Sequence, residues 1–152
     1  MVPGMRIHDA HEVQVAAGCE RCFEILLDVE GYPAWWPGAT ETQVLRPGPE
    51  PEVRLVFDPH LPGAGVIDLE LRFETEPPVA LRPRLLGGRL SRLEGPGWTL
   101  REQDGGGCLV RYEVEAEMDT GLPGFLEKRF AGQAARFLVT EPVEALKRRA
   151  EG

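Results

Sequence analysis

Apolar and charged residues alternate most regularly over residues 66–75, where Leu69, Leu71 and Phe73 share one side and acidic or basic residues share the other. Residues 110–117 show the same period of two. Because successive side chains of a strand point to opposite faces, each segment predicts a strand with one buried and one exposed face. Such alternation is typical of antiparallel sheets.

Weaker alternation predicts further strands on both sides of these two. Pro83 has no backbone N–H to donate, so the strand that contains it is expected at an edge of the sheet. Proline and glycine predict loops at residues 46–51 and 58–65, and residues 104–107, Asp-Gly-Gly-Gly, predict a hairpin turn. The additional strands are predicted over residues 7–16, 40–45, 52–57, 79–86 and 89–103, the last with an interruption at 95–97.

Helical periodicity occurs in two places. Residues 18–28 predict a short amphipathic helix, and a long terminal helix is expected to start near Leu122. Thr120 is a candidate cap for that helix, and Pro123 is tolerated in its first turn. Pro142 would remove a helical hydrogen bond, so a kink or break is expected there. The apolar stripe of the terminal helix consists of Leu122, Phe125, Leu126, Phe130, Ala134, Phe137 and Leu138.

Two of the three tryptophans stand side by side within residues 31–37, Gly-Tyr-Pro-Ala-Trp-Trp-Pro. Each proline fixes its own φ and pushes the preceding residue toward an extended conformation, so neither regular helix nor strand is expected here. The segment follows the short helix directly and is interpreted as a rigid aromatic turn. Two roles stay open for the aromatic rings of this segment. They could fill the end of the core, or they could contact a ligand.

The order of these elements, together with residues 17–37, resembles the polyketide cyclase/dehydrase and lipid-transport branch of the START-like superfamily. The most specific part is Asp28-x-x-x-Tyr32-Pro33-x-Trp35-Trp36-Pro37. The resemblance implies an α+β helix-grip fold, with a curved antiparallel sheet of about six or seven strands around a long C-terminal helix. It implies one domain over residues 1–152, an apolar pocket between sheet and helix, and ligand contact by at least one tryptophan ring.

The leading functional hypothesis is binding or transport of a small hydrophobic molecule such as a lipid, quinone or polyketide-like compound. Tyr112 is the best polar contact, because its phenol lies on the apolar side of its strand and needs a partner from protein, water or ligand. The inward positions of six separated segments define the expected ligand-binding residues, which are Trp36, Phe57, Leu69, Leu71, Phe73, Trp98, Tyr112, Phe130 and Phe137.

The alternative hypothesis is an aromatase/cyclase-like enzyme that acts on a polyketide. Such chemistry needs a proton donor or acceptor beside an enolisable carbonyl. Arg54 is expected to face solvent and His60 lies in a Pro/Gly loop, so neither suits that role. The sequence shows no Ser-His-Asp or Cys-His arrangement and no nucleotide-binding fingerprint, and no catalytic residue is predicted.

Charge narrows the choice of partners. The chain of 152 residues has a net charge of −8, which disfavours nucleic acid because that binding depends on clustered Lys and Arg. The basic run at residues 147–149 is explained by compensation of a helix dipole. No apolar stretch approaches the roughly 20 residues of a membrane span and no signal-peptide pattern is visible, so a cytoplasmic location is expected. The oligomeric state is left open.

Three cysteines in a chain without an export signal predict reduced thiols. Cys19 and Cys22 form a C-x-x-C pair, but a zinc site needs a second pair of ligands, and Cys108 stands alone. The three histidines show no metal-binding spacing. Neither a metal nor a cofactor is therefore expected, and Cys22 is interpreted as a small buried hydrophobe.

Overall fold

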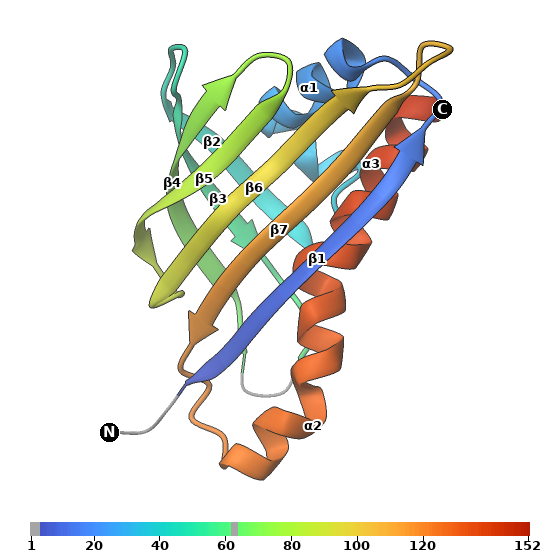
Figure 1. Cartoon of the computed structure of the whole chain (residues 1–152). Coiled ribbons are helices and arrows are strands. Elements are labelled where there is room, and N and C mark those ends of the chain that lie inside the picture. The colour runs from blue at the N-terminus through green and yellow to red at the C-terminus, as the bar shows by residue number, and fades with distance from the viewer. Residues whose placement is uncertain (1–3, 62–63) are drawn as a thin grey trace.

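A seven-stranded antiparallel sheet curves around the C-terminal helices in the computed structural model, which describes residues 4–61 and 64–152 (Figure 1). The strand order is β1-β7-β6-β5-β4-β3-β2. This confirms the predicted helix-grip architecture. The strands are β1 (Met5–Val15), β2 (Ala39–Arg46), β3 (Glu52–Phe57), β4 (Ile67–Glu76), β5 (Ala80–Gly88), β6 (Arg92–Glu102) and β7 (Cys108–Met118).

The two regularly alternating segments form β4 and β7, and their registers are as predicted. Leu69, Leu71 and Val114 are buried, whereas Glu70 is exposed and Glu115 is only half-buried. The apolar side of each strand therefore faces the helices. This inner face forms the sheet side of the core.

β5 is not an edge strand, which contradicts the expectation based on Pro83. The edges of the sheet are β1 and β2, and β5 lies between β4 and β6. Its regular pairing with β6 is limited to Ala80–Thr99 and Leu81–Trp98 and ends before Pro83. The missing N–H of the proline therefore interrupts no ladder on that side.

The predicted interruption at residues 95–97 is a bulge within one continuous strand. β6 stays paired with β7 on both sides of it, and the register shifts between Glu94 and Gly97. Gly97 has a φ of +75°, and a Cβ atom there would lie 2.6 Å from the carbonyl oxygen of Leu81. The close approach of β5 and the positive φ both require glycine at this position.

The aromatic turn is helical, which the prolines had argued against. α1 (Cys19–Leu27) is followed by a 3₁₀ helix at Val29–Ala34 that contains Pro33. The fixed φ of proline suits a helical turn, and short 3₁₀ segments are common as connectors. The backbone N–H groups of Trp35 and Trp36 both donate to the carbonyl of Tyr32 and hold the turn closed.

The terminal helix is divided into α2 (Gly124–Ala135), a π-helical turn (Arg136–Thr140) and α3 (Glu141–Glu151). The expected disturbance at Pro142 takes the form of this π turn, which directly precedes α3 and adapts the backbone to the missing N–H. None of the described helices is long and apolar enough to cross a membrane.

Two expectations for the start of α2 are wrong. The N-cap position is occupied by Pro123, while the hydroxyl of Thr120 accepts a hydrogen bond from the N–H of Leu122 and donates one to Glu127. Phe125 is exposed although it belongs to the predicted apolar stripe. Phe125 lies about half a turn around the helix from the buried Ala134, on the side that faces solvent. Figure 1 shows that this part of α2 also extends past the end of the sheet.

The prediction of three reduced cysteines is also wrong. A disulfide joins Cys19 to Cys108, whose Cα atoms are 5.0 Å apart, and Cys22 is a free, buried thiol. Cys19 begins α1 and Cys108 begins β7, and the fold brings these two element starts together across 89 residues of sequence. In the loop predicted at residues 58–65, Pro62 and Gly63 lie outside the described residues.

Candidate ligand cavity

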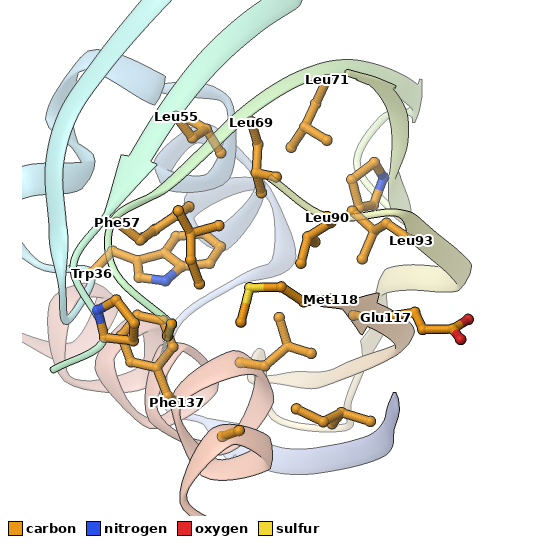
Figure 2. A pocket seen from close by; sticks show the side chains of 18 of the residues that line it. Trp36, Leu55, Phe57, Leu69, Leu71, Leu90, Leu93, Glu117, Met118 and Phe137 are labelled. Carbon is orange, nitrogen blue, oxygen red and sulfur yellow. The ribbon is translucent and has the colours of Figure 1, made fainter. Parts of the chain in front are cut away.

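A cavity of about 100 Å³ lies between the inner face of the sheet and the C-terminal helices (Figure 2). Side chains from the aromatic turn, the strands and the π turn converge on it, as the sequence predicts. Eight of the nine expected ligand-binding residues line this cavity, namely Trp36, Phe57, Leu69, Leu71, Phe73, Trp98, Tyr112 and Phe137.

Phe130 is the exception and is not part of the lining. It is half-buried and lies on the same stripe as Ala134 and Leu138, both of which line the cavity. The cavity therefore ends at Ala134, one helical turn before Phe130 would be reached. The periodicity identified the correct side of the helix but could not show how far along it the cavity extends.

Several lining residues were missed by the sequence analysis. Leu55 and Met118 could have been found, because Leu55 lies two positions from Phe57 and Met118 six positions from Tyr112, which puts each on the inward side of its strand. Pro83 and Leu90 carry no such signal, because their place in the lining depends on how the whole sheet pairs and curves.

Trp36 occupies the centre of a group of aromatic rings. It is 9% exposed, and its ring centroid lies 4.9 Å from that of Tyr32, 5.6 Å from that of Phe57 and 5.9 Å from that of Trp98. Figure 2 shows Trp36 and Phe57 together at one side of the cavity. The ring thus packs into the core and lines the cavity at once. Its contact with a ligand stays a prediction.

Two tyrosines supply hydroxyl groups to this region. The hydroxyl of Tyr32 donates a hydrogen bond to the carbonyl of Leu26, and burial raises the pKa of Tyr32. Tyr112 stacks on Trp98 with centroids 4.2 Å apart, and burial raises the pKa of Tyr112 as well. Among the described residues, the Tyr112 hydroxyl has no hydrogen-bond partner. It is therefore a neutral donor available at the cavity wall.

The lining carries almost no charge. Its carboxylate, Glu117, points away from the cavity (Figure 2) and lies 3.8 Å from a guanidinium nitrogen of Arg6 and 4.0 Å from one of Arg92. Thr120 marks one end of the lining, where its hydroxyl donates to the carboxylate of Glu127 at 2.5 Å. Within the described part of the chain, no Lys, Arg, His or Asp side chain lines the cavity.

Arg54 and His60, which had been considered as catalytic groups, lie elsewhere. Arg54 makes a two-point contact with Asp68, at 3.1 and 2.7 Å, and this hydrogen-bonded pair raises the pKa of the guanidinium. His60 is exposed, with its Nδ1 atom 3.4 Å from Asp58. In the described ranges, no three His, Cys, Asp or Glu side chains are grouped closely enough to hold a metal ion.

Phe137 separates the cavity from a cleft on the protein surface. Its ring meets Phe57 edge-to-face at 6.3 Å on the inner side, while Gly38, Gln133 and Glu141 accompany it along the outer cleft. Gly38 has a φ of +84°, and a Cβ atom there would lie 2.5 Å from the Phe137 ring. This close approach fixes the position of the ring.

The seven-stranded sheet, the helical cover and the apolar cavity between them define a helix-grip protein. The chain belongs to the family described as polyketide cyclase/dehydrase and lipid transport, whose model matches residues 6–151. No curated protein sequence matches the chain.

Solved structures with low sequence identity share the fold. The chain is similar to the Zhui aromatase/cyclase from Streptomyces sp. R1128, with a TM-score of 0.77 and 20% identity over 96% of this chain and 94% of that one. A START superfamily protein from Mycobacterium smegmatis has a TM-score of 0.73 and 21% identity, covering 95% and 97%. A STAR-related lipid transfer protein from Xanthomonas axonopodis has a TM-score of 0.69 and 18% identity, covering 94% and 85%.

Proposed function

We propose that this protein binds, and in doing so carries, a small hydrophobic molecule in the cavity between sheet and helices. The family includes lipid transport in its description, and the residues expected to contact a ligand converge on one apolar space. The single observation that carries the proposal is the lining itself, which combines aliphatic and aromatic side chains with a few hydroxyls. Apolar walls with few polar groups are typical of orienting ligand sites.

The alternative, a polyketide cyclase, has one feature in its favour. The hydroxyl of Tyr112, which has no hydrogen-bond partner among the described residues, could polarise a carbonyl, and one structural relative is an aromatase/cyclase. General acid–base catalysis also needs a group that exchanges protons near neutral pH. The raised pKa of Tyr112 makes it a poor base, and the described lining provides no His, Lys or Asp to replace it. Binding without catalysis is therefore the preferred function.

Native mass spectrometry of protein purified from its own host tests the proposal directly. A reproducible additional mass that is removed by organic solvent is expected. A second arm measures binding of Nile red, a neutral apolar dye, to the wild type and to Ala116→Phe. Ala116 is buried and lines the cavity, so the added ring should occupy the space and reduce dye binding at least tenfold.

Leu86→Phe is the matched control for the dye experiment. Leu86 is an exposed residue of β5, so this variant adds aromatic surface without filling the cavity. It should bind Nile red as the wild type does. Dye binding that is unchanged by Ala116→Phe, together with no co-purifying mass, would refute the proposal. Turnover of a polyketide substrate would instead establish the enzyme. The cytoplasmic location and the absence of nucleic-acid partners stay predictions.

A further inference from the structure

The solvent-facing side of α2 combines an exposed aromatic ring with positive charges. Phe125, in the first turn, is 72% exposed. Lys128 and Arg129 follow it by three and four residues, a spacing that places them beside it on the helix surface. Arg136, the first residue of the π turn that continues α2, lies eleven residues after Phe125, about three turns along the same side. These four exposed residues are called the α2 outer face below.

The positive charges of this face are not neutralised within the described structure. Neither Lys128, Arg129 nor Arg136 lies within ion-pair distance of a carboxylate among the described residues. Arg54 and Arg92 on the sheet, in contrast, are paired with carboxylates. Residues 120–140 contain three cations and a single carboxylate, Glu127. That carboxylate is buried and bound to Thr120, so it does not share the outer face.

Charge and apolarity together indicate the partner. The whole chain has a net charge of −8, so a face with only positive charges is a local departure that attracts anionic surfaces. An exposed phenylalanine among cations is typical of helices that lie in the interface of a membrane. We propose that the α2 outer face docks on an anionic lipid bilayer, with Phe125 inserted at the headgroup boundary and the three cations beside anionic headgroups.

The position of α2 permits this contact. Figure 1 shows that its first turns extend beyond the end of the sheet. Phe125, Lys128 and Arg129 are exposed there, while Glu127 on the other side of the helix is buried. Thr120, just before α2, and Ala134, near its end, both line the cavity. Docking through α2 would therefore place this end of the cavity next to the bilayer. The docking does not require a bound ligand, so it can fail or succeed separately from the proposed function.

Vesicle flotation tests the docking. The wild type should float with phosphatidylcholine vesicles that contain phosphatidylserine, should not float with phosphatidylcholine alone, and should be released by high salt. Lys128→Gln/Arg129→Gln should weaken binding about 25-fold, which corresponds to about fivefold for each cation. The matched control is Arg148→Gln/Arg149→Gln, which removes the same charge from exposed positions on α3 and should bind as the wild type does.

Phe125→Ala separates insertion from simple charge attraction. It should reduce binding severalfold without altering the unfolding midpoint, because the ring is exposed. Ala116→Phe, which fills the cavity, should leave flotation unchanged. The proposal is overturned if the wild type does not bind anionic vesicles or if both double variants weaken binding equally. A third outcome also overturns it, in which polyglutamate binds the wild type and Phe125→Ala equally well and anionic vesicles bind neither. The partner would then be an acidic polypeptide.

Discussion

Truncation of Phe137 to alanine separates a ligand cavity from a filled core. Phe→Ala in a filled core costs about 3–5 kcal/mol, which includes the cavity that the change creates. Phe137 is only half-buried and already borders the cavity on one side and the surface cleft on the other. The free energy of unfolding should therefore fall by about 1–2 kcal/mol, roughly the transfer term of a partly buried ring.

The control is Phe23→Ala in α1. Phe23 is 3% exposed and lies outside the cavity lining, so its removal should cost the full core value of about 3–5 kcal/mol. Urea unfolding of both variants, with equal m values, gives the comparison. Nile red binding should also change in Phe137→Ala, because the wall between cavity and cleft is removed. Equal losses in the two variants, with no dye binding by the wild type, would contradict the cavity and leave the aromatic residues as packing.

Three further predictions follow from the cysteines and Tyr112. Cys108→Ser should lower the free energy of unfolding by about 2–4 kcal/mol, because the bond to Cys19 closes a long loop; stability of the wild type that does not respond to reductant would argue against this bond. Burial raises the pKa of the Cys22 thiol to about 11 from 9.0. As the pH rises, the unfolded chain loses the Cys22 proton before the folded protein does, so the free energy of unfolding is retained below pH 9 and declines toward pH 11. The urea midpoint of Cys22→Ala should therefore decline less than that of the wild type over this pH range. Tyr112→Phe should weaken binding of acetophenone about fivefold and leave ethylbenzene unaffected, as measured by calorimetry; equal effects on both would exclude a hydrogen bond from the Tyr112 hydroxyl.

The sheet was predictable because alternation is a local property of the chain. Leu69, Leu71 and Val114 are identified as inward residues by their own neighbours, and the structure places them so. The same reasoning failed at Pro83, because an edge position depends on which strands pair on each side. It failed at Phe125 because this residue lies at the margin of the predicted stripe, about half a turn around the helix from the buried Ala134.

The cysteines and the cavity depended on contacts that are distant in sequence. Cys19 and Cys22 are close in sequence and look like a pair, whereas the fold joins Cys19 at the start of α1 to Cys108 at the start of β7. The aromatic residues could be assigned to one interior volume, but whether they fill it depends on fractions of an ångström in their packing. Gly38 illustrates this, since the absence of its side chain sets the position of the Phe137 ring.

α2 and α3 bury different numbers of residues, although one apolar stripe runs through the sequences of both helices. α3 buries five residues against the fold, among them Val143 and Leu146, while α2 buries only Glu127 and Ala134. A helix with few buried apolar contacts opens locally at lower free energy than its well-packed neighbour. The π turn between them lies where this difference begins, and Phe137 belongs to that turn. The less firmly held helix therefore both covers the end of the cavity and carries the positively charged outer face.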